Sequence, residues 1–492
     1  MRWIRASSFL LAGLPTLLAG CATLRTAQCT SRGGEPWYEF ESPHFRLRSN
    51  ADFERALRTA NELEKYRRAL LAAWGEQFDP PGQLDVIGLS NRDQLSEFVN
   101  TRVAAYLTLL PGGWQAVMAL DYPFHSPSEA QLHELAHHLS HYVLLRQPKW
   151  LSEGLATYLQ TATVKDSPSE IILGEPHRAS LEQVRQRGWL SLQQLWTWSE
   201  DVSAPSRSAL YASSWLWFHY LTDEHHARFV DFQNRLSSAE EPLSAWDAAF
   251  SGVSPDVLER GLREYLDEGR FAVRIIAATL EAPRVIFRRM DDAEIHTTRA
   301  RLYLTARRTL SAADRRDLIL SEVVEALGHD PRNESARILQ AELASTRRER
   351  LAIAQQLVNS SAGSSASWSL FARSLDQDEN PLPDLEQLLQ RAASASVNDA
   401  AVLSQLASYY VKHGAAEKGL DSALRAVRLA PWQAGSVDTY AAILARVGNC
   451  DLAVSAQKRA MGLLGEYASE ELRMQYQKRL AEYAQRCPRE SR

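Results

Sequence analysis

Two histidines and a glutamate, His133, Glu134 and His137, stand in the spacing that a helix uses to hold a metal ion. Positions i and i+4 of a helix lie on one face, one turn apart, so both imidazoles can reach a single cation. The carboxylate beside the first histidine is then placed to take a proton from a water molecule that the cation activates. The spacing therefore predicts zinc-dependent hydrolysis, with His133 and His137 as ligands and Glu134 as general base.

The residues around this group predict the helix that must carry it. The N-cap is predicted at Ser126, followed by Pro127 at the first helical position. Glu129 would then be the acidic residue of a capping box. Apolar side chains then recur at helical spacing, at Leu132, Leu135, Ala136, Leu139 and Val143. We expect a helix that buries this stripe and holds the two histidines at its flank.

A catalytic zinc site takes three protein ligands and keeps one open position. His141 lies about 12 Å along the helix from His133, so the two cannot bind the same ion. His138 faces about 100° away from His137. Glu153 is the better third ligand, because the 16 residues after His137 allow the chain to turn and bring a second helix alongside.

The segments HELAHH, from His133 to His138, and WLSEGLATY, from Trp150 to Tyr158, together resemble the gluzincin metallopeptidases. The resemblance covers residues 35–270 and implies a zincin-like α+β fold, one Zn²⁺ per chain, and a peptide or protein substrate. Carried over by position, it implies a site formed by the ligands His133, His137 and Glu153 and the base Glu134.

Further along, Leu210–Leu221 resembles the helix that supplies a donor to the developing oxyanion in this group of enzymes. Tyr211 is the candidate for that role, with His219 behind it. An aromatic stripe on a helix also suits a protein core, so a purely structural role for Tyr211 stays open.

The N-terminal residues predict export and a lipid anchor. A basic start precedes an apolar stretch, residues 9–18, that is too short to span a bilayer. Leu18–Cys21 resembles the lipobox of bacterial lipoproteins, which implies cleavage after residue 20 and acylation of Cys21. We expect a signal peptide over 1–20 and a lipidated linker over 21–34. The protein would then lie in the cell envelope, at the outer membrane facing the periplasm, with the lipid anchor as its membrane contact.

Composition limits the classes of partner and the domain organisation that we expect. The 55 Lys and Arg against 60 Asp and Glu give a formal net charge of −5, so nucleic acid is not an expected partner. A chain of 492 residues with 45% hydrophobic residues predicts more than one domain. Cys450 and Cys487 could pair in an oxidising compartment, although nothing in the sequence compels it. The cysteine spacing predicts no second metal site.

Residues 35–270 predict an α+β domain with a small mixed sheet and active-site helices. Strand-like segments lie at 37–40, 45–48, 84–89 and 115–120, with a helix over 52–74. The strand at 115–120 could be a cleft edge on which a peptide pairs, or an internal strand; the sequence leaves both open. Helical, aromatic segments continue from 190 to 270.

Residues 271–492 resemble an α-helical tetratricopeptide array. Three pairs of small residues recur 34 positions apart: Ala407 and Ala441, Gly414 and Gly448, Ala426 and Ala460. Such spacing suits the contacts of stacked helix pairs. A degenerate earlier unit includes Ile319–Pro331, and the Ser-, Ala- and Gly-rich stretch at 360–369 predicts a loop. A generic helical domain is the alternative, since two aligned units are fewer than such arrays usually need.

Two functions are consistent with these features. The first is a zinc peptidase at the cell envelope whose repeats present substrate or dock a protein partner. The second is a catalytically silent lipoprotein that binds peptides or assists envelope assembly through its repeats. Because every expected ligand and the base are present, the enzyme is the function that the sequence favours.

Overall fold

A computed structural model describes residues 29–486 except 76–77, 100–102, 111–112, 122–127, 167–168, 199–203, 278–282, 308, 361–363, 376–383 and 465–467. The predicted signal peptide, Cys21 with its lipobox, and Cys487 lie outside the described residues. Cys450 is disulfide-bonded and Cys29 is free. Among the helices of the described part, none is both long and apolar enough to cross a membrane.

A six-stranded mixed sheet forms the centre of the molecule, in the order β4-β5-β3-β2-β1-β9. Its strands are β1 (Tyr38–Glu41), β2 (Phe45–Ser49), β3 (Leu84–Leu89), β4 (Ala105–Leu110), β5 (Gly113–Ala119) and β9 (Ile286–Arg289). β2, β3 and β5 run parallel, and the other three pair antiparallel. The strand expected at 115–120 is β5, and it is internal. The edge is β4, which the sequence analysis did not identify.

Helices cover both faces of this sheet. Along β5, Ala116 and Met118 contact one core while Val117 and Ala119 contact the other, as the alternation of a strand requires. On the first face lie α1 (Phe53–Leu71), α3 (Glu129–Val143) and α4 (Lys149–Leu159). On the second lie α2 (Arg92–Leu95), α11 (Asp292–Thr305) and α12 (Ala312–His329). The metal-binding motif therefore lies on a helix that is packed against the sheet.

A second, three-stranded antiparallel sheet and a group of helices flank α4. The strands are β6 (Thr163–Asp166), β7 (Ser169–Leu173) and β8 (Arg274–Ala277). The helices are α5 (Arg178–Arg187), α6 (Leu192–Trp196), α7 (Ala204–Glu224), α8 (His226–Ser237), α9 (Pro242–Ala249) and α10 (Pro255–Glu268). β8 and β9 follow residue 270 yet pair with strands that precede it. Both sheets therefore extend beyond the boundary predicted at 270, the small sheet to Ala277 and the large sheet to Arg289.

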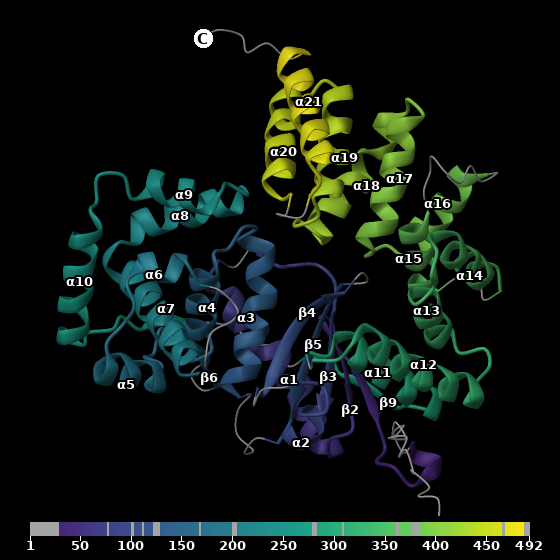
Figure 1. Cartoon of the computed structure of the whole chain (residues 1–492), viewed down its shortest axis with the longest axis horizontal. Helices are drawn as coiled ribbons and strands as arrows, with labels where there is room; N and C mark the ends of the chain where they lie inside the picture. The colour runs from purple at the N-terminus through teal and green to yellow at the C-terminus, as the bar shows by residue number, and fades with distance from the viewer. Residues whose placement is uncertain are drawn as a thin grey trace, which may run out of the picture.

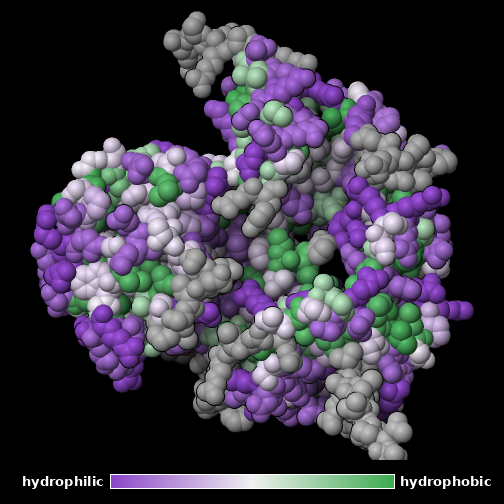
Figure 2. Space-filling view, viewed as in Figure 1, coloured by the Kyte–Doolittle hydropathy of each residue, from purple (hydrophilic) through white to green (hydrophobic). Residues whose placement is uncertain are grey.

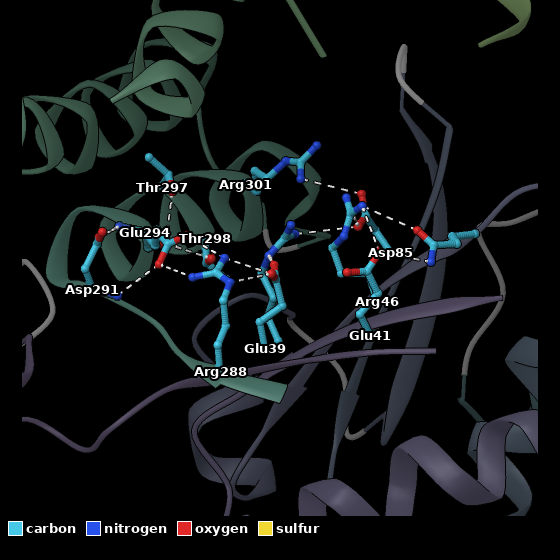
Figure 3. A network of polar contacts seen from close by, with 12 residues as sticks. Glu39, Glu41, Arg46, Asp85, Arg288, Asp291, Glu294, Thr297, Thr298 and Arg301 are labelled. Atoms are coloured by element: carbon cyan, nitrogen blue, oxygen red, sulfur yellow. Dashed lines mark hydrogen bonds and ion pairs between the residues drawn. The ribbon is translucent and has the colours of Figure 1, made fainter. Parts of the chain in front are cut away.

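Ion pairs join α11 to the strands of the large sheet (Figure 3). Arg288 lies between two carboxylates, 2.8 Å from Glu39 and 2.6 Å from Glu294 at the start of α11. Arg301 of α11 reaches Asp85 of β3 at 3.5 Å. Burial opposes charge on Asp85, but the neighbouring guanidinium groups outweigh it and lower the pKa of that carboxyl. α11 is thus fixed to the sheet by charge as well as by its apolar face.

The rest of the chain is a helical array, as expected. It comprises α13 (Glu334–Glu342), α14 (Arg347–Ser360), α15 (Ser365–Ser374), α16 (Leu385–Ala395), α17 (Ala400–Lys412), α18 (Ala416–Leu429), α19 (Ala434–Arg446), α20 (Cys450–Gly462) and α21 (Glu470–Arg486). α17 and α19 begin 34 residues apart, as do α18 and α20. The paired small residues have the expected roles. Ala407, Ala441, Ala426 and Ala460 are fully buried at helix contacts, and Gly414 and Gly448 take positive φ in the turns.

The loop predicted at 360–369 is wrong over its second half. Residues 361–363 lie outside the described residues, but α15 begins at Ser365, with Ser364 as its N-cap. Trp368 and Phe371 of α15 are buried in a local core. Burial of these two aromatic side chains outweighs the loop-forming composition of the stretch.

The array bends back until its C-terminal helices lie over α3 (Figure 1). Trp432, just before α19, contacts the rings of Tyr142 and Trp114, with centroid distances of 5.0 and 5.7 Å. At a second contact, the backbone of Gly462 meets that of Ala239, between α8 and α9. Between the array and the β4 edge the surface is hollowed (Figure 2), and a cavity of about 460 Å³ is lined by both sides.

Candidate metal centre

The first ligand helix, α3, starts later than the sequence suggested. Its N-cap is Ser128, which forms a reciprocal capping box with Gln131, and Glu129 is the first helical residue. The predicted box of Ser126 and Glu129 is therefore wrong by two positions; Ser126 and Pro127 lie outside the described residues. Ser128 and Gln131 have the same spacing, and the glutamine side chain closes the box equally well. The predicted stripe is buried, apart from Val143, which is half-buried.

The second ligand helix, α4, is placed by burial and by one glycine. Pro148 is its N-cap, and Trp150 and Leu151 anchor it in the core. α4 crosses α7 at Gly154, where a Cβ atom would lie 2.5 Å from the carbonyl oxygen of Ser214. Only glycine allows this approach, and it brings Glu153 beside the part of α7 that carries Tyr211.

Three ligand atoms converge between these helices. Nε2 of His133 lies 3.0 Å from Nε2 of His137 and 3.1 Å from Oε2 of Glu153. Nε2 of His137 lies 3.4 Å from the same carboxylate oxygen. All three side chains are largely buried, with 12–14% of their surface exposed. The structure thus brings together the three residues that the sequence assigned to the metal.

The Nδ1 atom of each histidine contacts a residue of α4 or the residue that follows its last turn. Nδ1 of His133 lies 2.8 Å from Oε1 of Gln160, so this nitrogen donates, and Nε2 offers its lone pair to a cation once it has lost its own proton. Nδ1 of His137 lies 3.1 Å from Oγ of Ser152. Such partners fix ring orientation and tautomer in metal sites. Sequence reasoning missed both, although Gln160 lies two helical turns after Glu153 on the same face.

The carboxylates and the histidines of the site stabilise one another's charged forms. Burial raises the pKa of Glu153, but hydrogen bonds from both histidines outweigh burial and hold its pKa far below the ordinary range. Burial opposes charge on His133, and the hydrogen bond and negative charge of Glu153, with the charge of Glu134, raise its pKa overall. Glu153 is therefore an anion here, as a metal ligand must be.

Glu134 and Tyr211 lie at the same site. Glu134 is half-buried on α3 and close enough for its charge to act on both His133 and Tyr211. The ring of Tyr211 lies 6.2 Å from that of His133, between centroids, which places the phenol beside the ligand cluster. Burial and the two carboxylates raise the pKa of Tyr211 well above its usual range, so the phenol stays a proton donor.

The other candidate histidines lie elsewhere. His138 and His141 pack against Trp114, and burial lowers the pKa of His138 to about 3 and that of His141 to about 4. Neither belongs to the ligand cluster, as the helical geometry predicted. His219 is fully buried, with Nε2 3.0 Å from the carbonyl oxygen of Gly174 and Nδ1 2.8 Å from the hydroxyl of Tyr265. Its position among these partners gives it a structural role.

The donor set fits a zinc ion. Bonds of about 2.1 Å in a tetrahedral arrangement separate two ligand atoms by roughly 3.4 Å, and the three separations here are 3.0, 3.1 and 3.4 Å. Two imidazole nitrogens and one carboxylate oxygen are the ligands of several catalytic zinc sites. The two Nε2 atoms lie 3.0 Å apart, and the Nδ1 atom of each ring contacts another side chain. A cation between the two Nε2 atoms would bind both.

Known proteins resemble this chain only weakly, and only in part. No family model matches the chain, and no curated protein matches it. Among solved structures it is similar to TTC0263, a thermophilic TPR protein of Thermus thermophilus, at 18% identity over 38% of this chain and 99% of that chain (TM-score 0.28). It is also similar to YrrB, described as a TPR protein with an unusual peptide-binding site (17%, 38% and 92%, TM-score 0.28), and to MamA (16%, 38% and 95%, TM-score 0.26).

Proposed function

We propose that the protein is a zinc-dependent peptidase. The observation that carries the proposal is the convergence of His133, His137 and Glu153 within 3.0–3.4 Å, with Glu134 beside them. Two imidazoles and a carboxylate leave a fourth position for the reacting groups. An additional carboxylate that does not bind the metal, placed next to a ligand on the same helix, is what hydrolysis requires.

Each residue has a part in peptide hydrolysis. When bound, Zn²⁺ supplies Lewis-acid chemistry, activating water and polarising a carbonyl group. Glu134 takes the proton of the attacking water and delivers it to the nitrogen of the departing amine. Tyr211, kept protonated, donates a hydrogen bond to the oxygen that becomes negative in the transition state. Gln160 and Ser152 hold the imidazoles so that both Nε2 atoms point to one place.

The proposal also includes a location in the cell and a class of substrate. The lipobox supports attachment through acylated Cys21 at the bacterial cell envelope, with the periplasmic face of the outer membrane as the favoured site. A peptide or an unfolded protein segment is the substrate class that the resemblance to gluzincins suggests. The helical array would then bring such a substrate or a partner protein to the catalytic region.

A second candidate function is peptide binding without catalysis. It is favoured by the cavity of about 460 Å³ between the array and the β4 edge, where Asp399 and Gln433 face Trp114. The cavity is large enough for several side chains of a bound segment. In this function the array and the sheet edge form the binding surface, and the metal cluster stabilises the fold.

The Glu134→Gln variant of the mature protein separates the two functions. It should retain about one zinc at this site, because Glu134 is not a ligand, and lose at least about 100-fold in peptide cleavage. Glu129→Gln, on the same helix but with a side chain 63% exposed, is the matched control and should cleave at the wild-type rate. The readout is cleavage of envelope proteins by mass spectrometry, with zinc content measured in parallel. Equal cleavage by wild type and Glu134→Gln would refute the peptidase; bound but uncut peptides with both would favour the second candidate.

A further inference from the structure

A second group of metal-ligand side chains lies far from the first, on the other face of the large sheet. Cys29 precedes a short 3₁₀ helix, η1 (Thr30–Arg32), while His296 lies on α11 and His329 ends α12. One ligand atom from each residue lies within 4.8 Å of the other two. Cys29 and His296 are buried, and His329 is at the exposed rim. The three come from distant parts of the sequence.

The imidazole of His296 is oriented as in a metal ligand. Its Nδ1 lies 2.6 Å from Oε2 of Glu322, and Arg299 binds the other oxygen of that carboxylate at 3.0 Å. The carboxylate therefore accepts a hydrogen bond from Nδ1–H, which leaves Nε2 with its lone pair. His296 is 0% exposed, and its Nε2 has no hydrogen-bond partner among the described residues. An unpaired acceptor in this position costs free energy unless a cation or another donor reaches it.

His329 lies on the other side of the thiol, with a carboxylate farther from its ring. Its Nδ1 lies 4.0 Å from a carboxylate oxygen of Asp292, too far for a hydrogen bond, and its Nε2 lies 3.6 Å from Sγ of Cys29. Nε2 of His329 is therefore directed at the thiol, and Nε2 of His296 is the ring nitrogen of that residue left without a partner among the described residues. Zinc bonds of about 2.1 Å to nitrogen and 2.3 Å to sulfur separate the two ligand atoms by roughly 3.6 Å in a tetrahedral site.

We propose that Cys29, His296 and His329 form a second metal site, for a divalent cation of the Zn²⁺ type. A thiolate with two imidazoles selects zinc and its close relatives over the oxygen-binding cations Mg²⁺ and Ca²⁺. This inference goes beyond the proposed peptidase and does not depend on it. The expectation from cysteine spacing did not include such a site, because two of the proposed ligands are histidines about 270 or more positions after the cysteine.

The site would have a defined structural effect. Cys29 follows the predicted lipidation site, Cys21, by eight residues. A metal bound to Cys29 and to the α11–α12 pair would therefore attach the end of the tether to the two helices that cover the second face of the large sheet and precede the array. Cross-links that close long stretches of chain stabilise the folded state by restricting the unfolded one.

Cobalt substitution distinguishes this site from the first one. Co²⁺ bound by a thiolate has a strong ligand-to-metal charge-transfer band in the near ultraviolet, which a site of two histidines and a glutamate lacks. Titration of the full mature chain with Co²⁺ under a metal-free reductant should produce this band. It should persist in Glu153→Ala, which removes a ligand of the first site, and disappear in Cys29→Ser and His329→Ala.

Zinc content provides the second measurement. Wild type should bind about two zinc ions per chain, and Cys29→Ser and Glu153→Ala about one each, at the two different sites. Cys29→Ser should also lower the melting temperature in zinc but not after removal of metal. His413→Ala, an exposed histidine at the end of α17, is the control for surface binding. No charge-transfer band in wild type, or a zinc content unchanged by Cys29→Ser, would overturn the proposal, whatever the outcome for the peptidase.

Discussion

Gln160, just past the end of α4, accepts a hydrogen bond from Nδ1 of His133 over 2.8 Å, although His133 belongs to α3. The same helix, α4, supplies Glu153, whose carboxylate lies 3.1 Å from the other nitrogen of that ring. α4 and the residue after its end therefore contact both ring nitrogens of His133. The ring can neither rotate nor change tautomer without losing one of these contacts.

Removing this acceptor should weaken metal binding. In Gln160→Leu the Nδ1–H group of His133 loses its partner, and zinc affinity should fall about 10- to 100-fold, the usual effect of such outer contacts. Gln147→Leu is the control, since Gln147 bonds Ser140 and no metal ligand. Competition with a chromophoric chelator measures both affinities. Equal affinities for the two variants would show that Gln160 does not orient the ligand.

The choice of third ligand can be tested directly. Glu153→Ala should lower zinc affinity at the first site by orders of magnitude, because it removes one of the three converging atoms. His141→Ala should leave the zinc content intact, since His141 stacks on Trp114 with ring centroids 4.4 Å apart. Metal analysis of both purified variants decides between them. Zinc lost from His141→Ala but kept in Glu153→Ala would reverse the assignment.

Tyr211→Phe should keep the ring and the metal but remove the donor to the oxyanion. We expect kcat to fall about 100- to 1000-fold with little change in KM, because the lost hydrogen bond forms mainly in the transition state. Tyr142→Phe, whose ring contacts Trp432 rather than the metal site, should keep wild-type kcat. Steady-state kinetics on a short peptide measures both. A rise in KM with kcat unchanged would assign Tyr211 to substrate binding.

The crossing of α4 and α7 depends on Gly154. In Gly154→Ala the added methyl group meets the backbone of Ser214, so the helices must separate, at a cost of about 1–3 kcal/mol in unfolding free energy. Zinc affinity should fall as well, because Glu153 moves with α4. Gly328→Ala is the matched control in α12, where a Cβ atom meets nothing within 4 Å. It should stabilise the protein by about 0.5–1 kcal/mol. Urea denaturation followed by circular dichroism compares the two.

Acid should weaken the contact between α1 and the β1–β2 turn. Burial raises the pKa of Glu64, but hydrogen bonds from His44 and Ser42 outweigh it and lower the pKa below its ordinary value of 4.5. A carboxylate with a lowered pKa stabilises the fold fully above about pH 4.5 and loses this contribution as the pH falls below it. Glu64→Gln should therefore be less stable at neutral pH by about 1–3 kcal/mol. The difference from wild type should shrink toward pH 3 in unfolding experiments; a constant difference would contradict it.

Local patterns predicted the parts of this molecule that depend on local contacts. β3 has the expected bounds, Leu84–Leu89, because its apolar run is bounded by turn residues. The 34-residue phase of the last helix pairs followed from buried alanines and turn glycines. The ligands His133, His137 and Glu153 came together because each lies on a well-specified helix.

Long-range pairings could not be predicted in the same way. β9 is a short strand with four exposed residues, and it pairs with β1 almost 250 positions earlier. β4 is apolar on both faces over much of its length and lacks the alternation that marks a strand. The cluster of Cys29, His296 and His329 likewise has no local spacing. Its ligands are neighbours only because α11 and α12 cover the second face of the sheet.

The contact of Trp432 with Tyr142 joins the helical array to α3, the helix that carries His133 and His137. Tyr142 lies five residues after His137, about one and a half helical turns along the same helix. A displacement of the array at Trp432 would therefore reach α3 close to the candidate metal centre.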